Sequence, residues 1–312
     1  MSTRDTIAVI GSGMMGPGIS ARSALAGNKT KLFSRSPERA AAGLEKARYC
    51  IQQLLDNKIV NQRQARNANE LLESSTDYER ELGDVFWVIE AITEDLSRKQ
   101  ELFTLIDAVV PPEVIITSNT SGLRITEIAQ FTGHPERTAT THFWFPAHLI
   151  PLVEVVMGDK TDERIALHVK ELLLGWNKAP VVVKKDLPGQ LANRILQAMI
   201  REAIHIVQIG LATPEDVDTA VKMGMGMRMP VWGPLEHIEA VGLDLALSVQ
   251  QSVLPGVSSD VEPSTYLKEL VKLGKLGYKT GAGFYDWKAK DMKALAEKRD
   301  IFIMNALKSI RP

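Results

Sequence analysis

The sequence has little of several features that would indicate particular classes of protein. Cys50 is the single cysteine, which excludes an internal disulfide and a zinc site built from several thiolates. Since no base stands beside it in sequence, we interpret Cys50 as a packed residue and not as a nucleophile. No apolar run reaches about 18 residues, so we expect no membrane span. The formal net charge is only -1, and we therefore do not expect nucleic acid as a partner.

What remains is the composition of a globular protein with two domains. The chain has 312 residues, of which 45% are hydrophobic and 24% are charged, and this length suffices for two ordinary cores. The first predicted strand follows a short polar start, which leaves no room for a signal peptide. We therefore expect a cytoplasmic protein.

A glycine-punctuated turn stands at the start of the chain. An apolar run over residues 6–10 leads into Gly11, Gly13 and Gly16, and a helical pattern follows. In a strand, turn and helix of this kind, the first glycine permits the turn, the second admits a pyrophosphate and the third allows close packing of the helix. The pattern predicts a dinucleotide site; the alternative is a glycine-rich loop without a ligand.

The end of the second predicted strand, at residues 29–33, bears on the cofactor. An NAD site usually has an acidic residue here for the ribose hydroxyls, whereas this chain has Ser34, Arg35 and Ser36. A guanidinium can clamp the extra phosphate of NADP. The pattern favours NADP over NAD; the alternative is a solvated arginine in a surface turn.

The rest of the first half repeats the rhythm of strand, helix and strand. Two helices are expected between residues 38 and 70, and others over 17–26, 96–110 and 162–174. Further strands are expected over 85–89, 114–116, 138–143, 152–156 and 180–183. The fold class is therefore α/β, a Rossmann-type, doubly wound, mostly parallel sheet followed by an all-α C-terminal domain.

We place the domain boundary where the strand pattern stops. Residues 1–187 form the predicted dinucleotide-binding domain and residues 188–312 a helical domain for substrate binding and dimerisation. Its helices are expected over 192–210, 214–223, 234–253, 264–273 and 292–307, with a glycine-punctuated segment over 277–287.

Two residues stand out as an acid and base pair. His142 ends a predicted strand at the carboxyl edge of the sheet, where ligands of such folds bind. Glu154 is alone in an apolar run and needs a partner, which an imidazole would supply. The alternative for Glu154 is a buried structural acid.

Polar residues at the same edge complete a candidate constellation. Asn119 and Ser121 follow the preceding strand, and Asn193 follows Pro188 and Gly189. Ser121 and Asn193 are able to hold a substrate hydroxyl, although each would also serve as a helix cap.

As an ordered set, motifs along essentially the whole chain resemble the 3-hydroxyacyl-CoA dehydrogenase superfamily. They are Gly11 to Gly16, Glu90-Ala91-Ile92, Glu101-Leu102-Phe103, Ser118-Asn119-Thr120-Ser121, His142-Phe143, Leu152-Val153-Glu154-Val155, Pro188-Gly189 with Asn193-Arg194, and Gly277-Tyr278-Lys279-Thr280-Gly281 with Gly283-Phe284-Tyr285.

The resemblance implies roles for individual residues. His142 corresponds to the general base, Glu154 to the residue that orients it, and Ser121 and Asn193 to the residues that position the hydroxyl, while Lys99 corresponds to a lysine near the cofactor. The expected cofactor contacts are Gly11, Gly13, Met14, Met15, Gly16, Ser34, Arg35, Ser36, Glu94, Lys99 and Asn119. No metal is expected.

The departures from the family pattern bear on the substrate. Members that act on acyl-CoA usually read His-Phe-Phe-Asn-Pro, whereas this chain has Phe145 in place of the asparagine. The segments 147–154 and 226–236 are more similar to the branch with lambda-crystallin/L-gulonate 3-dehydrogenase, carnitine dehydrogenase and a pyridine-carboxylate dehydrogenase. Arg228, in a Met-rich segment, needs an anion. That anion is either a substrate carboxylate or a glutamate in a structural ion pair.

The leading hypothesis is an NAD(P)-dependent dehydrogenase that interconverts a secondary alcohol, on a small 3-hydroxy acid or related polar carboxylate, with its ketone. Ser121, Phe145, Asn193 and Arg228 are the candidate substrate contacts. The alternatives are a true 3-hydroxyacyl-CoA dehydrogenase and a non-catalytic, crystallin-like nucleotide-binding protein. The resemblance also implies a homodimer through the C-terminal domain.

Overall fold

The computed structural model describes residues 6–310. Two compact units, Met1–Asn193 and Arg194–Pro312, make up the chain, where the sequence analysis places the boundary after residue 187. Asn193 is thus the last residue of the first unit.

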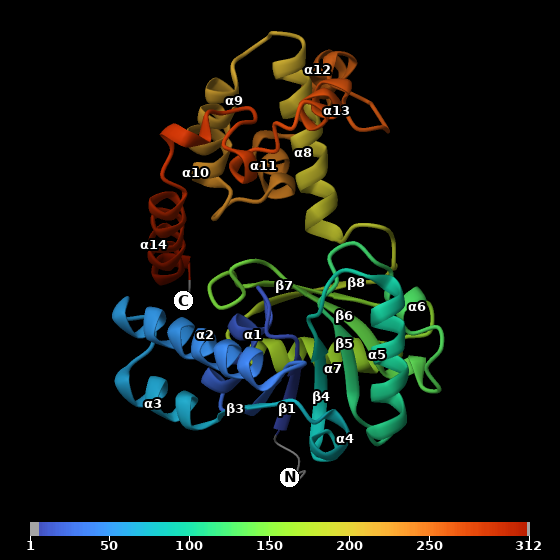
Figure 1. The fold of residues 1–312 in the computed structure, drawn as a ribbon. Helices are drawn as coiled ribbons and strands as arrows, with labels where there is room; N and C mark the ends of the chain where they lie inside the picture. Colours follow the sequence, from blue (N-terminus) through green and yellow to red (C-terminus); the bar gives the residue numbers. More distant parts are fainter. Residues whose placement is uncertain (1–5, 311–312) are drawn as a thin grey trace. The chain divides into compact units, whose positions relative to one another are not determined.

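One eight-stranded sheet forms the centre of the first unit, with the strand order β3-β2-β1-β4-β5-β6-β7-β8 (Figure 1). Neighbouring strands are parallel except β6 and β7, which are antiparallel. The strands are β1 (Thr6–Ile10), β2 (Lys29–Phe33), β3 (Leu72–Ser75), β4 (Val85–Glu90), β5 (Ile115–Ser118), β6 (Thr138–Phe143), β7 (Leu152–Val156) and β8 (Ala179–Val183).

The chain order reverses between β1 and β4, which lie side by side at the centre of the sheet. In doubly wound sheets, ligands bind at the carboxyl ends of the strands beside such a reversal. The predicted fold class is confirmed, and the sheet order places the glycine turn after β1 at this position.

β3 is a strand that no sequence pattern predicts. Its residues, Leu-Glu-Ser-Ser, include one buried side chain, that of Leu72, and the strand lies at the edge of the sheet beside β2. An edge strand that is mostly polar lacks the apolar alternation by which strands are recognised.

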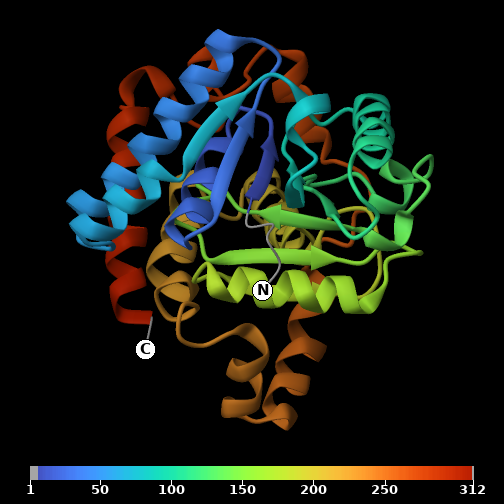
Figure 2. The same ribbon diagram turned by 90° about the horizontal axis from the view of Figure 1, so that it is seen from below.

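Helices cover both faces of the sheet (Figure 2). They are α1 (Gly16–Leu25), α2 (Pro37–Asp56), α3 (Gln62–Glu70), α4 (Tyr78–Glu81), α5 (Leu96–Val109), α6 (Ile125–Ile128) and α7 (Glu163–Gly175), with a 3-10 turn at Pro135–Arg137.

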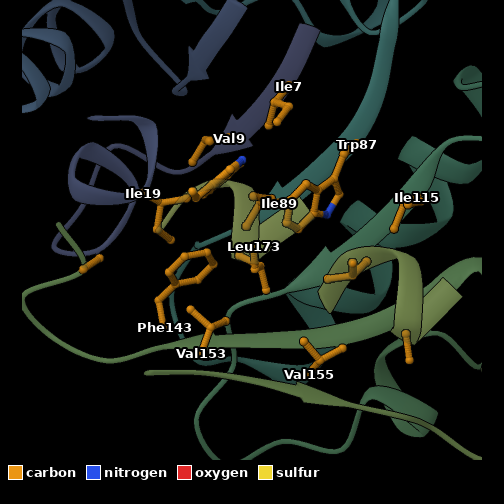
Figure 3. Close-up of a cluster of buried hydrophobic side chains, with 14 of the residues drawn as sticks. Ile7, Val9, Ile19, Trp87, Ile89, Ile115, Phe143, Val153, Val155 and Leu173 are labelled. Atoms are coloured by element: carbon orange, nitrogen blue, oxygen red, sulfur yellow. The ribbon is translucent and has the colours of Figure 1, made fainter. Parts of the chain in front are cut away.

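Alternate side chains of the strands form two separate cores. Ile7 and Val9 of β1 belong to a buried cluster with Ile19 of α1 and Leu173 of α7 (Figure 3). The residues between them, such as Ala8, face the opposite side and belong to a second cluster with α5 and α6. This is why the strands read as continuous apolar runs: both faces of a parallel sheet are covered.

The second unit is helical. Its elements are α8 (Leu191–Gln208), which begins in the last residues of the first unit, α9 (Pro214–Ala220), a π-helical turn (Val221–Met225), α10 (Gly226–Arg228), α11 (Pro234–Val241), α12 (Leu243–Val253), α13 (Thr265–Lys272), α14 (Met292–Ile310) and 3-10 turns at Leu254–Gly256, Tyr278–Thr280 and Trp287–Ala289.

The long helix expected over 234–253 is two helices. Gly242 separates α11 from α12 with a φ of 102°, a conformation that glycine adopts without the strain of a Cβ. No helix within residues 6–310 combines the length and apolar character that crossing a bilayer requires.

Candidate active site

The turn between β1 and α1 has room for a ligand at one glycine and for no side chain at the other two. A Cβ on Gly11, whose φ is 123°, would lie 2.4 Å from the carbonyl oxygen of Ala91, and a Cβ on Gly16 would lie 1.8 Å from that of Gly11. A Cβ on Gly13 would meet nothing within 4 Å. The first amides of α1 have no partners within the helix. The turn therefore fits a bound pyrophosphate.

The two methionines of the turn differ in exposure. Met14 is 76% exposed, whereas Met15 is half-buried against the core and stands at the N-cap of α1. Both lie in the turn between β1 and α1, and their contact with the cofactor stays a prediction.

No carboxylate follows β2. The Ser34 side chain is buried and its Oγ lies 2.8 Å from that of Ser12 in the glycine turn, so the two loops are joined by a hydrogen bond. Arg35 is exposed. The Ser36 hydroxyl accepts from the Arg39 amide at 3.4 Å and caps α2.

A fully buried ion pair stands at the end of β4. Lys99 of α5 lies with its Nζ 2.6 Å from Oε1 of Glu90, and the two side chains are 1% and 0% exposed. The Glu90 carboxylate also accepts from the Ile92 amide at 2.6 Å and the Ser118 hydroxyl at 2.5 Å. Lys99 reaches a second carboxylate, that of Glu94, at 3.5 Å. Its charge is thus matched within the protein.

Glu94 holds the loop that carries Ser121. Its Oε1 accepts from the Thr120 hydroxyl at 2.7 Å and from the amides of Ser121 and Gly122 at 2.9 and 3.0 Å. Burial raises the pKa of the Glu94 carboxyl, but these hydrogen bonds and the charge of Lys99 together lower that pKa by a larger amount. The net pKa therefore lies below its usual value. A charged Glu94 therefore fixes the loop.

Asn119 joins three strand ends. The backbone amide of Asn119 donates to the Glu90 carbonyl at 2.7 Å, and the side-chain oxygen Oδ1 accepts from the backbone amide of Phe143 at 2.8 Å. The side chain therefore ties the end of β5 to the end of β6 beside His142.

His142 and Glu154 meet across the antiparallel strands. They are register partners on β6 and β7, and Nδ1 of His142 lies 2.7 Å from Oε2 of Glu154. The same oxygen accepts from the Trp144 indole at 3.0 Å, and Oε1 accepts from the Ala192 amide at 2.8 Å. The sequence-predicted pair is thus in hydrogen-bond contact.

The Glu154 carboxylate is ionised in this setting. Burial raises the pKa of Glu154. The hydrogen bonds from His142, Trp144 and the Ala192 amide, together with the charge of His142 when it is protonated, lower that pKa by a larger amount. The net pKa lies below the usual value of a glutamate, so the side chain carries its charge at neutral pH.

The structure also brings Ser121 and Asn193 together. Nδ2 of Asn193 donates to the Ser121 carbonyl at 3.3 Å, and Asn193 follows Ala192, whose amide binds Glu154. Both side chains are at least partly exposed, so they are open to a ligand.

The two other candidate substrate contacts lie apart in the chain. Phe145 is 49% exposed, two residues after β6. Arg228 ends α10 in the second unit and is exposed. Among the described residues of the second unit, its guanidinium has no hydrogen bond or ion pair with another residue. A structural ion pair, one of the two alternatives for Arg228, is therefore not formed within the second unit.

Three residues in the hydrogen-bond networks of this site were not predicted from the sequence. Glu90 appeared only as part of a motif, the Ala192 contact is a backbone amide that no side-chain pattern reveals, and Trp144 was passed over although it lies two residues from His142. The described residues contain no group of three or more histidine, cysteine or acidic side chains placed to hold a metal ion.

The glycine turn, the switch point and the buried pair of His142 and Glu154 together fit a nicotinamide-dinucleotide-dependent dehydrogenase. Comparison with known proteins gives the family. The NAD binding domain of 3-hydroxyacyl-CoA dehydrogenase matches residues 6–187, and the C-terminal domain of that enzyme matches residues 189–287. The chain belongs to the 3-hydroxyacyl-CoA dehydrogenase family, and the predicted class of enzyme is confirmed.

Individual relatives differ in what they act on. A probable 3-hydroxybutyryl-CoA dehydrogenase of Bacillus subtilis (strain 168) is 39% identical over 286 residues, 91% of this chain and 98% of that protein. A 5-formyl-3-hydroxy-2-methylpyridine 4-carboxylate 5-dehydrogenase of Mesorhizobium japonicum is 32% identical over 300 residues, 94% of each. A crystal structure of an enzyme with this pyridine activity, described as an NAD+ dependent dismutase, superposes with a TM-score of 0.91 at 30% identity and covers 98% of both chains.

Proposed function

We propose that the enzyme interconverts a secondary alcohol, β to a carboxylate or related group, with its ketone, and that His142 is the general base. The observation that carries this proposal is the 2.7 Å contact between His142 Nδ1 and Glu154 Oε2. Because Glu154 is charged, Nδ1 donates its hydrogen and Nε2 keeps the lone pair that accepts the hydroxyl proton.

Glu154 then stabilises the product of that proton transfer. The imidazolium that forms lies beside a carboxylate whose side chain is 0% exposed, so little solvent screens the attraction. When bound, the oxidised nicotinamide supplies the hydride acceptor. In the reverse direction, the imidazolium returns its proton to the carbonyl oxygen.

Ser121 and Asn193 are the proposed positioning groups for the substrate oxygen. Glu94 holds the Ser121 loop through its backbone amides, and Asn193 is bonded to the same loop. A hydroxyl and an amide that are fixed in this way lower the entropic cost of aligning the substrate.

For the cofactor we propose the segment Gly11 to Gly16, the residues Ser34, Arg35 and Ser36, and Glu94, Lys99 and Asn119 at the switch point. NADP remains the favoured cofactor on charge grounds, because position 34 carries no acid and Arg35 is exposed. The similar pyridine enzyme is described as NAD+ dependent, so dissociation constants for NADPH and NADH decide the preference.

For the substrate we propose a small 3-hydroxy acid or a related polar carboxylate, as in the branch that contains lambda-crystallin/L-gulonate 3-dehydrogenase and carnitine dehydrogenase. Support comes from Arg228, whose guanidinium lacks an acidic partner among the described residues of the second unit and would bind a carboxylate. The pyridine-carboxylate relative acts on a free acid by its name. The intact acid and base pair argues against a purely crystallin-like role.

A 3-hydroxyacyl-CoA substrate is the second candidate, favoured by the 39% identity to the probable 3-hydroxybutyryl-CoA dehydrogenase. Fluorescence titration with NADPH and NADH, followed by reduction assays with acetoacetyl-CoA and a panel of small keto acids, separates the two. Efficient reduction of acetoacetyl-CoA alone would replace the free-acid proposal. An Arg228→Gln variant is expected to raise the KM for a free acid at least about tenfold.

We also propose a homodimer through the second unit. No residue of α8, α9, α11 or α12 is buried, and α12 exposes Leu243, Leu245, Leu247, Val249 and Val253. Exposed apolar patches of this kind mark protein–protein interaction sites. Sedimentation equilibrium tests it: a monomeric mass at micromolar concentration would contradict the dimer.

A further inference from the structure

Trp144 shares its hydrogen-bond acceptor with the proposed base. Its indole Nε1 donates to Oε2 of Glu154 at 3.0 Å, and the same oxygen lies 2.7 Å from Nδ1 of His142. The ring centres of Trp144 and His142 are 5.7 Å apart, with their planes inclined by 53°. The indole therefore contacts both members of the pair.

We propose that Trp144 is a positioning residue that weakens the hold of Glu154 on the proton of His142 and so sets the pH at which the base becomes available. This inference rests on the proposed function, because it concerns the same base. It adds a residue to which neither the sequence pattern nor the family assignment gives a role.

The physical reason is competition at one oxygen. A donor that binds Oε2 disperses part of the negative charge that would otherwise act on the imidazolium alone. The attraction between Glu154 and an imidazolium at His142 is then weaker than it would be with an unshared carboxylate.

A rotation of the carboxylate would not separate the two donors at Oε2 without also breaking the hydrogen bond at Oε1. Its other oxygen, Oε1, accepts from the Ala192 amide at 2.8 Å, so three donors hold the group. Removing the indole donor leaves the remaining two in place, which is why the expected effect is electrostatic and not a loss of the contact with His142.

Three elements pair with the strand of Glu154 or contact its carboxylate. β6 contributes His142, β8 places the apolar Val181 opposite Glu154, and the start of α8 contributes a backbone amide. Among the described residues, the charge that acts on this carboxylate is that of His142 in its protonated form. A shift in the His142 titration on changing Trp144 therefore reports their shared acceptor.

Trp144→Phe tests the proposal, because it keeps an aromatic ring and removes the donor. The pKa of His142, followed by NMR of the imidazole in the cofactor-free protein, is expected to rise by up to about one unit, the equivalent of one hydrogen bond to a charged group. The acid limb of kcat/KM for alcohol oxidation is expected to move to higher pH by the same amount. An unchanged or lowered His142 pKa would overturn the proposal.

Trp87→Phe is the matched control. The Trp87 side chain is buried and its indole donates to Thr117 Oγ1 at 2.9 Å, so the variant loses an indole hydrogen bond within the same sheet without touching Glu154. Its His142 pKa is expected to match the unaltered protein. An equal rise in both variants would show general loosening and overturn the role of Trp144.

Two readouts keep this inference distinct from the proposed function. If the NMR pKa rises while the acid limb of kcat/KM stays in place, Trp144 tunes His142 but His142 is not the base. If the limb moves without the NMR pKa, the tuning is contradicted. In the unaltered protein, the Trp144 indole resonance is expected to shift with the midpoint of His142; a resonance that does not respond contradicts the shared acceptor even if Trp144→Phe fails to fold.

Discussion

His142 and Glu154 are register partners across β6 and β7, the strands at which the otherwise parallel sheet changes direction. Residues directly opposite in an antiparallel pair have their Cβ atoms about 5 Å apart and project on the same face. Twelve positions of sequence separation thus become a 2.7 Å contact. The reversal of strand direction is what builds the pair.

Glu154→Gln is expected to change how stability depends on pH. The pKa of Glu154 is lowered in the folded protein, because hydrogen bonds from His142, Trp144 and Ala192 outweigh the opposing effect of burial. A lowered pKa stabilises the fold above the unfolded value near 4.5, and this contribution is lost as pH falls through the folded pKa.

Urea denaturation of both proteins between pH 3 and 7 measures the difference. The gap in the free energy of unfolding should be largest near neutrality and should shrink in acid. A gap that stays constant over this range would show that the charge of Glu154 plays no part.

Glu94→Gln is expected to lower kcat about tenfold or more with a smaller change in cofactor affinity. The carboxylate accepts from the amides of Ser121 and Gly122, and the neutral amide binds them less strongly, so Ser121 loses its fixed position. Glu81→Gln is the matched control, because Glu81 pairs with Lys31 at 3.0 Å away from the loop. Equal kcat in the Glu94 and Glu81 variants would contradict the assignment.

Lys99→Met is expected to destabilise the protein by about 3–5 kcal/mol, since it leaves the fully buried Glu90 carboxylate without its counter-charge. Thermal denaturation of the single variant and of Glu90→Gln/Lys99→Met provides the measurement. The double variant should recover part of the loss. If both are equally unstable, the cost lies in packing and not in the uncompensated charge.

Ser34→Asp is expected to weaken NADPH binding at least about tenfold and to leave or improve NADH binding. A carboxylate at the end of β2 accepts from the ribose hydroxyls and repels a 2′-phosphate. Fluorescence titrations give both dissociation constants. If the unaltered protein already prefers NADH, the preference inferred from Ser34 and Arg35 is wrong.

The sheet was predictable because its strands are buried on both faces. Runs such as residues 85–89 and 152–156 are apolar without interruption, and the glycine turn marks the first crossover. β3 was not predicted because it has no apolar pattern. It is a strand because its backbone pairs with β2. The break between α11 and α12 at Gly242 was not predicted, because an isolated glycine within a helical pattern is usually tolerated.

The contact between His142 and Glu154 was also predictable, from an isolated glutamate in an apolar strand and a histidine at a strand end. What sequence could not give is how Glu154 is shared. Its donors, Trp144 Nε1 and Ala192 N, come from the segment after β6 and from the start of α8. The folded chain brings these two segments to the same carboxylate. Glu94 was predicted as a cofactor contact, and its hold on the Ser121 loop depends on backbone amides that carry no sequence signal.

The His142→Gln variant tests the central claim most directly, because glutamine keeps a polar side chain but cannot take up the proton. Cofactor dissociation constants and kcat for the substrate found in the screen are measured on the same preparation. Cofactor affinity is expected to stay within about twofold, and kcat is expected to fall by about a hundredfold or more. Turnover within about tenfold of the unaltered enzyme would contradict His142 as the base.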